Sequence, residues 1–130
     1  MSSKKKSSVL TVLLFLLGSL SPASVISQTD SYKGKTITII QGREPGALGD
    51  MRVRAVMPYL QKFIPGNPTI MTEFMTGGGG RKATNHIYRS VRPDGLTLGN
   101  VGAGLIANAI LGEPGVQYDI DKLIYLGSPN

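Results

Sequence analysis

The chain has 130 residues, 17 of them glycine and 8 proline, and it contains no cysteine. This length suits one small domain or part of one, and the lack of cysteine excludes disulfides and thiolate metal sites. The formal net charge is +6, but Lys4, Lys5 and Lys6 supply half of it. Because the remaining charge is mild and no basic run is interleaved with aromatic residues, we expect no nucleic-acid partner.

The first 27 residues have the pattern of a secretory signal peptide. The three lysines precede an apolar run from Val9 to Leu20, and small residues follow it as far as Ser27. This run is shorter than the roughly 20 residues that a membrane-spanning helix needs. The pattern therefore favours a cleaved signal over a membrane anchor. We expect residues 1–27 to be removed, and the exported protein to begin near Gln28.

The first strand and helix follow a short polar segment. The β-branched run from Thr36 to Gln41 predicts a strand, and a loop from Gly42 to Gly46 leads to a helix from Leu48 to Phe63. Asp50 lies in the first turn of that helix, where a carboxylate suits the helix dipole. The helical spacing predicts one apolar stripe, formed by Leu48, Met51, Ala55, Tyr59 and Phe63 with Val56 and Leu60 beside them.

A proline interrupts this first helix. Pro58 lacks the backbone N–H that a helix interior requires and would cost about 3 kcal/mol in a straight helix. We therefore expect a kink at Pro58, or a helix that ends near Met57.

A βαβ unit occupies the middle of the chain. The residues predict a strand from Thr69 to Phe74, four glycines, a helix from Arg81 to Ser90, a turn and a strand from Leu96 to Gly99. The glycines lie between the carboxyl end of a strand and the amino end of a helix. Open α/β sheets bind ligands there, and the helix terminus favours an anion.

Two consecutive βα units predict the fold class. We expect an α/β fold with a mostly parallel sheet, right-handed crossovers and both faces covered by helices. After the third strand we expect a short apolar helix that runs to about Leu111 and a fourth strand from Leu123 to Leu126.

The sequence offers few residues for catalysis. His86 is the only histidine, and no serine lies in a nucleophile elbow, so we expect no catalytic residue, no metal site and no cofactor. One motif leaves an enzyme alternative open, because Gly102 to Ala107 matches GxGxxA after a strand, a pattern typical of nucleotide binding. The motif follows the third strand. The dinucleotide fingerprint would require the motif to follow the first strand, and it also requires an acidic residue about 20 positions further on, which we do not expect here. Arg43 could point into a cleft at the first strand–helix loop or lie on the surface.

Several segments, in order, resemble the substrate-binding proteins of tripartite tricarboxylate transporters, which are periplasmic solute receptors. The similarity covers residues 33–128, and it depends on the order and spacing of its segments more than on any single motif. The segments are Tyr32 to Ile40, the glycine-rich loop with Asp50 and Arg54, Ile64 to Thr69, Phe74 to Gly80 with Ala83, Asn85 and Tyr88, and Arg92 to Gly99.

The resemblance implies a two-lobed Venus-flytrap receptor in the periplasm. Such a receptor binds a small carboxylate, has no enzymatic activity and passes its ligand to the membrane subunits of the transporter. In this family the first two strand–helix loops hold the carboxylate through backbone N–H groups and water. Carried over to this chain, the implied substrate-binding residues are Gly42, Arg43, Gly46, Gly49, Asp50, Thr76, Gly77, Gly78, Gly79 and Gly80.

The same resemblance sets expectations for length and for the loops. Family members are much longer, so we expect residues 28–130 to be the first part of lobe 1, without the second lobe. Arg43 and Glu44 stand where the family often has small or apolar residues, and Thr76 and Gly78 stand where it often has proline and alanine.

Overall fold

The computed structural model describes residues 31–128, so the expected signal peptide and its cleavage point lie outside the described residues. Within that range, β1 (Thr36–Gln41), β2 (Thr69–Phe74) and β3 (Thr97–Asn100) form a sheet in the order β2-β1-β3. Both pairs are parallel. The predicted α/β class with a parallel sheet is confirmed.

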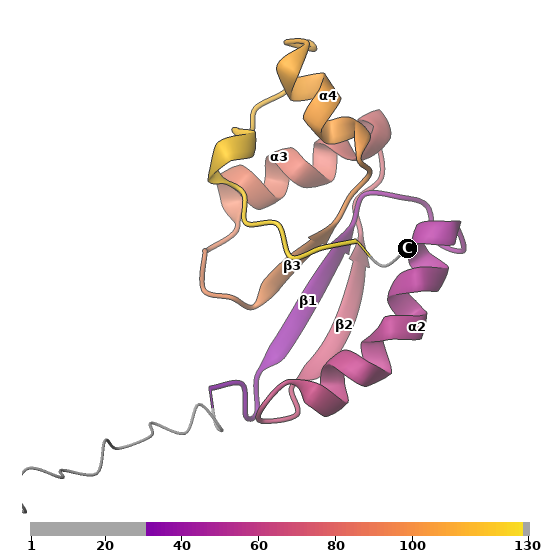
Figure 1. Ribbon diagram of the computed structural model, residues 1–130, viewed down its shortest axis with the longest axis vertical. Helices are drawn as coiled ribbons and strands as arrows, with labels where there is room; N and C mark the ends of the chain where they lie inside the picture. The colour runs from indigo at the N-terminus through magenta and orange to yellow at the C-terminus, as the bar shows by residue number, and fades with distance from the viewer. Residues whose placement is uncertain (1–30, 129–130) are drawn as a thin grey trace, which may run out of the picture.

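Helices cover the two faces of this sheet. Figure 1 shows α2 (Leu48–Phe63) on one side, α3 (Arg81–Ser90) on the other, and α4 (Gly104–Ile110) beyond the carboxyl ends of the strands. The central strand β1 is therefore enclosed from both sides, as a parallel strand requires. The core consists of small and medium-sized apolar side chains, namely Ile37, Ile39, Ile40, Val53, Ala83, Leu105 and Tyr118.

Most of the predicted apolar stripe of α2 lies on the exposed side of the helix. Leu48, Met51 and Phe63 are 63%, 59% and 72% exposed, whereas Asp50 and Val53 are the buried residues of the helix. The inner face is fixed by a polar contact with the end of β1, described below. Apolar periodicity within one helix cannot reveal such a partner.

Pro58 does not end α2, which continues to Phe63. Proline removes only its own N–H bond and its interior cost is about 3 kcal/mol. Here the side chain of Pro58 lies on the exposed flank of the helix. Of the two alternatives expected at Pro58, the helix end near Met57 is therefore wrong, and the kink stays a prediction.

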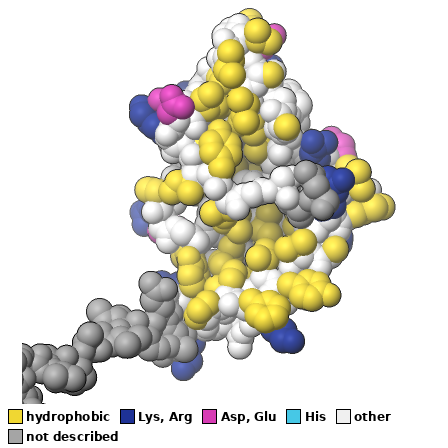
Figure 2. Space-filling model, viewed as in Figure 1, with side chains coloured by type: hydrophobic (Ala, Val, Ile, Leu, Met, Phe, Trp, Pro, Cys, Tyr) yellow, Lys and Arg dark blue, Asp and Glu magenta, His cyan; other side chains and the backbone are white. Residues whose placement is uncertain are grey.

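The predicted fourth strand is also absent from the described residues. A short 3₁₀ turn, η2 (Ile120–Lys122), leads into a segment without regular secondary structure, in which Ile124 is 89% and Leu126 is 77% exposed. Figure 2 shows apolar side chains over much of the viewed face of the molecule. An apolar run becomes a strand only when another strand pairs with it, and local composition does not supply that partner.

The chain before this segment is tied to α3 and α4. Asn85 donates to the carbonyl of Gly115 at 2.9 Å and accepts from the N–H of Gln117 at 2.9 Å. The buried Tyr118 hydroxyl donates to the carbonyl of Leu105 at 2.8 Å.

Within residues 31–128, no helix is both long enough and apolar enough to cross a membrane.

Candidate ligand-binding site

The strand order defines where a ligand would approach. The chain moves from β1 to β2 on one side and then returns to β3 on the other side of β1. In open α/β sheets, such a reversal opens a crevice outside the carboxyl ends of the two strands concerned. The switch point here, where such a crevice would be expected, lies between the loop after β1 and the loop after β3.

Glycines from three loops touch at this edge of the sheet. A Cβ atom added to Gly42 would lie 2.9 Å from the Cα of Gly80, which leaves no room for a side chain. A Cβ added to Gly80 would lie 3.7 Å from the backbone nitrogen of Gly102. The loops after β1, β2 and β3 therefore meet as bare backbone, and each glycine permits the close approach.

Arg43 lies across this junction. A Cβ on Gly49 would lie 2.8 Å from the Cδ of Arg43, and a Cβ on Gly102 would lie 2.8 Å from its Nη2. The aliphatic stem therefore lies along Gly49, and the guanidinium reaches the loop after β3. Among residues 31–128, the recorded ion pairs are Arg54–Asp50 and Lys122–Asp119, so no carboxylate in that range neutralises Arg43.

The side chain of Asp50 fixes the conformation of the loop after β1 through three hydrogen bonds. Its Oδ1 accepts from the Nε2 of Gln41 at 2.8 Å, and its Oδ2 accepts from the N–H of Gly46 at 2.8 Å and from the Nε of Arg54 at 3.0 Å. The side chain is only 1% exposed. Asp50 therefore positions Gly46 and the start of α2, and it does not present its carboxylate at the surface.

The network continues across the sheet to β3. The Nδ2 of Asn100 donates to the Oε1 of Gln41 at 3.1 Å and lies 3.3 Å from the carbonyl oxygen of Gly49, a second acceptor. Gln41 is fully buried at the end of β1. Asp50, Gln41 and Asn100 thus join the carboxyl ends of two strands to the first turn of α2, and we call them the Asp50 network.

These bonds lower the pKa of the Asp50 carboxyl. The hydrogen bond from the Gly46 backbone is the largest cause, followed by the bond from Gln41, and both favour the ionised form. Burial acts in the opposite direction, and Arg54 adds a smaller stabilisation of the charge. The charged carboxylate is therefore part of the folded state.

The glycine loop after β2 is held by backbone conformation. Gly77, Gly78, Gly79 and Gly80 have φ angles of 123°, 58°, 65° and 96°, values that residues with a side chain rarely adopt. The turn η1 (Gly78–Gly80) closes with a bond from the N–H of Gly80 to the carbonyl of Gly77 at 3.1 Å. The preceding amides, those of Gly78 and Gly79, therefore lie before the first bonded position of the turn and have no partner within it.

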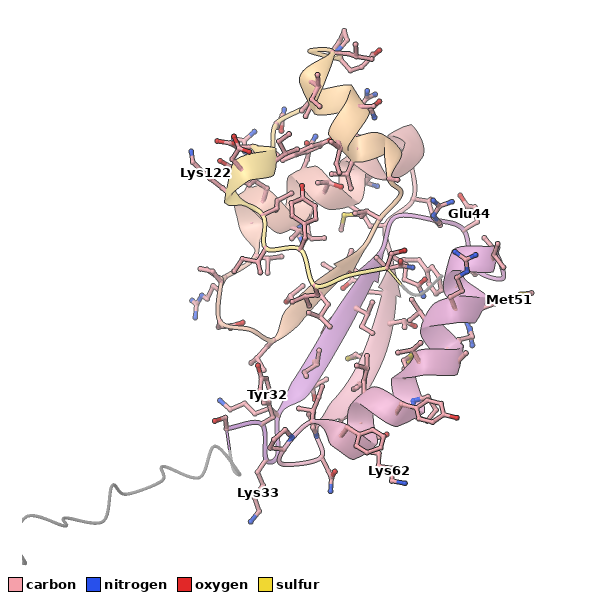
Figure 3. All side chains as sticks on the ribbon, viewed as in Figure 1. Tyr32, Lys33, Glu44, Met51, Lys62 and Lys122 are labelled. Atoms are coloured by element: carbon pink, nitrogen blue, oxygen red, sulfur yellow. The ribbon has the colours of Figure 1, made fainter. Side chains whose placement is uncertain are left out.

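The remaining predicted residues differ in their exposure to solvent. Gly77, Gly78 and Gly79 are exposed, Thr76 is half-buried, and Gly42 is buried. Figure 3 places Glu44 beside the start of α2 at this end of the sheet, while Tyr32 and Lys33 lie at the opposite end. The exposed groups at this end of the sheet thus include the Arg43 guanidinium, the glycine backbone and the Glu44 carboxylate.

Sequence reasoning missed Gln41, Asn100 and Gly102 as members of this site. A signal for the first two existed, because a polar residue ends each of two strands in an otherwise apolar or β-branched pattern. Polar residues at the carboxyl ends of adjacent parallel strands meet at one edge of the sheet. The strand order was needed to show that β1 and β3 are the adjacent pair.

The GxGxxA motif lies at the same edge, after β3. An acidic residue does stand near the distance that the dinucleotide fingerprint requires, since Asp121 follows Gly102 by 19 positions. It lies in the exposed turn η2, not at the end of a following strand where it would meet a ribose. The motif therefore lacks the structural context of a dinucleotide site.

Among residues 31–128, no group of three or more histidine or acidic side chains could hold a metal ion. Comparisons of the chain with protein-family models, with curated proteins and with solved structures found no match.

Proposed function

We propose that this chain binds a small carboxylate at the junction of its three strand–helix loops. The observation that carries the proposal is Arg43, a guanidinium without a described carboxylate partner that lies across bare glycine backbone at the switch point of the sheet. Arginine binds carboxylates through two parallel N–H donors, which gives both affinity and orientation.

The glycine loop would supply a second set of donors. The amides of Gly78 and Gly79 precede the bonded part of η1, and α3 begins directly after Gly80. Unpaired amides and a helix amino end both favour negative charge. A ligand with two carboxylates could therefore meet Arg43 with one group and the glycine loop with the other.

The proposed context is that of an exported receptor and not an enzyme. The signal-like N-terminus, the parallel βαβ arrangement and the resemblance to receptors of tripartite tricarboxylate transporters support it. In that setting the ligand would be enclosed by a second lobe in the periplasm and passed to membrane subunits. The nucleotide alternative has weaker support, because the GxGxxA loop follows the third strand and Asp121 lies away from any strand end.

The test is titration of the full chain with small carboxylates, followed by ¹H–¹⁵N NMR. We expect dissociation constants in the millimolar range, because the Arg43 and glycine groups are exposed to water, where a helix terminus is worth only about 0.3–1 kcal/mol. The amide signals of Gly78, Gly79 and Gly102 should shift together with increasing succinate or citrate.

A matched pair of variants makes the test specific. Arg43→Gln should abolish these shifts, while Arg92→Gln, which removes an exposed arginine near the opposite end of β3, should leave them unchanged. Equal loss in both variants would indicate non-specific charge attraction. Shifts with ATP and none with carboxylates would favour the nucleotide alternative.

A further inference from the structure

The strand β2 lies at one side of the sheet and is an edge strand. Within the described residues, β2 pairs only with β1, so its other side is an open edge. The N–H of Thr69 donates to the carbonyl of Lys35, just before β1, and the N–H of Met75 donates to the carbonyl of Gln41, at the end of β1. Because backbone groups alternate in direction along a parallel strand, those of Ile70, Thr72 and Phe74 point to the open edge.

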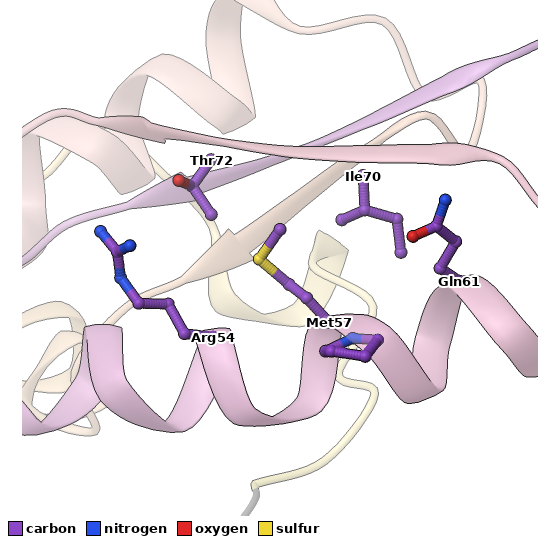
Figure 4. Close-up of a pocket in the computed structure, with 6 residues that line it drawn as sticks. Arg54, Met57, Gln61, Ile70 and Thr72 are labelled. Atoms are coloured by element: carbon purple, nitrogen blue, oxygen red, sulfur yellow. The ribbon is translucent and has the colours of Figure 1, made fainter.

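A groove runs along this same edge. It has a volume of about 270 Å³ and is lined by Arg54, Met57, Pro58, Gln61, Ile70 and Thr72. Figure 4 shows Ile70 and Thr72 on β2 facing α2, with Met57 between them and with Arg54 and Gln61 toward opposite ends. The groove is therefore bounded by α2 on one side and by the α2-facing side chains of the edge strand β2 on the other.

The two ends of the groove differ in charge. The Nε of Arg54 donates to Asp50, and the side chain remains 63% exposed. A guanidinium has five N–H donors, so the two terminal nitrogens are available to a second acceptor. Gln61 at the other end is neutral, and Glu73 points to the opposite face of the sheet because side chains alternate along a strand.

We propose that this groove binds an extended peptide that ends in a free carboxylate, added as a parallel strand to β2. Parallel addition places the carboxyl end of the peptide toward the carboxyl end of β2, which is where Arg54 lies. Backbone hydrogen bonds to Ile70 and Thr72 would hold the strand, and the peptide side chains on the α2 face would contact Met57 and Ile70. This is strand addition to a sheet edge, in which the flexible Met57 side chain accommodates different apolar residues.

The proposal is independent of the carboxylate site described above. That site lies between β1 and β3, whereas the groove lies on the outer side of β2. The two can therefore be tested separately, and Arg43→Gln should not affect peptide binding.

The experiment is fluorescence anisotropy with the full chain and a labelled peptide. The probe is acetyl-Lys-Thr-Val-Thr-Val with a fluorophore on the lysine, made both as the C-terminal acid and as the C-terminal amide. The acid should bind about 5- to 20-fold more tightly than the amide, because a charged acceptor strengthens hydrogen bonds from a guanidinium. Equal affinity of the two peptides would overturn the proposal.

Backbone pairing is tested without altering the protein. N-methylation of the peptide amide that faces β2 should weaken binding about tenfold, whereas N-methylation of the next amide, which faces away, should have little effect. Equal effects of the two methylations would overturn strand addition.

Protein variants complete the test. Thr72→Pro removes an outward N–H at an edge position where proline is tolerated, so it should weaken binding about tenfold. Met71→Thr changes a side chain on the other face and should leave binding unchanged. If Thr72→Pro instead abolishes a concentration-dependent dimer and no peptide binds, the edge pairs with a second copy and the proposal is wrong.

Discussion

The loops after β1 and β2 reach the same edge of the sheet by different means. The first is held by side chains, because Asp50 fixes Gly46 and Gln41 while Asn100 ties Gly49 to β3. The second, from Gly77 to Gly80, is shaped by four positive φ angles. A loop held by side chains fails when a partner is removed, whereas a loop held by conformation fails when a side chain is added.

The largest effect should come from removing the centre of the side-chain-held loop. Asp50→Ala leaves three donors without their acceptor, and a buried orphan such as the Nε2 of Gln41 alone costs about 1–3 kcal/mol. We expect a large fall in the urea midpoint of unfolding. Asp121→Ala, at an exposed acidic position, should leave the midpoint unchanged; a similar fall in both would contradict a specific role for the Asp50 network.

Acid should act on the same loop. The folded pKa of Asp50 is lowered, so its stabilisation is complete above the ordinary aspartate pKa of about 3.9 and disappears as the pH falls through the lower folded value. The urea midpoint should therefore decrease below about pH 4. Asp50→Asn should flatten this decrease, leaving a smaller slope from Asp119, whose pKa is lowered by the Asp121 N–H and by Lys122. An unchanged slope in Asp50→Asn would exclude Asp50 as its source.

Close approach between the two loops gives the next test. The Cβ of Gly42→Ala would lie 2.9 Å from backbone at Gly80, and overpacking of this kind costs about 1–3 kcal/mol. Gly104→Ala is the matched control, because its Cβ meets nothing within 4 Å at the start of α4. At the first position of α4 that change should be neutral or slightly stabilising. If Gly42→Ala were as stable in thermal unfolding as Gly104→Ala, the loops would not touch.

The conformation-held loop is tested by Gly79→Val. Its Cβ would meet nothing within 4 Å, so the cost comes from φ at 65° and should be about 1–2 kcal/mol. The added side chain would also cover the proposed ligand approach, so the carboxylate-induced NMR shifts should disappear. Gly79→Asn tolerates the left-handed conformation better and should recover most of the stability. Unchanged ligand shifts in Gly79→Val would remove this loop from the site.

Local sequence signals were sufficient for most of the regular elements. The bounds of β1, β2 and α3 match the prediction, and β3 lies one residue further along than predicted. These elements follow from β-branched runs, from helical spacing and from glycine or proline at their ends. Their pairing into a parallel sheet follows from the βα alternation.

Two of the errors, at α2 and at residues 123–126, have a common physical cause, which is dependence on a distant partner. Asp50 is buried because Gln41 meets it from β1, and no pattern within α2 contains that contact. Leu123 to Leu126 has strand composition but no strand beside it among the described residues. The junction of three loops required the strand order, which brings Gly80 next to both Gly42 and Gly102.

The smallest effect is expected at Ile124. Its side chain is 89% exposed, so replacement by serine removes almost no buried apolar area and should change the free energy of unfolding by less than about 0.5 kcal/mol. Ile39→Val is the contrasting change in the buried centre of β1 and should cost about 0.5–1.5 kcal/mol. Urea unfolding of the two variants compares a segment without a strand partner with a strand enclosed on both faces. A loss at Ile124 as large as that at Ile39 would mean that residues 123–128 pack against another surface in solution, as the predicted fourth strand would require.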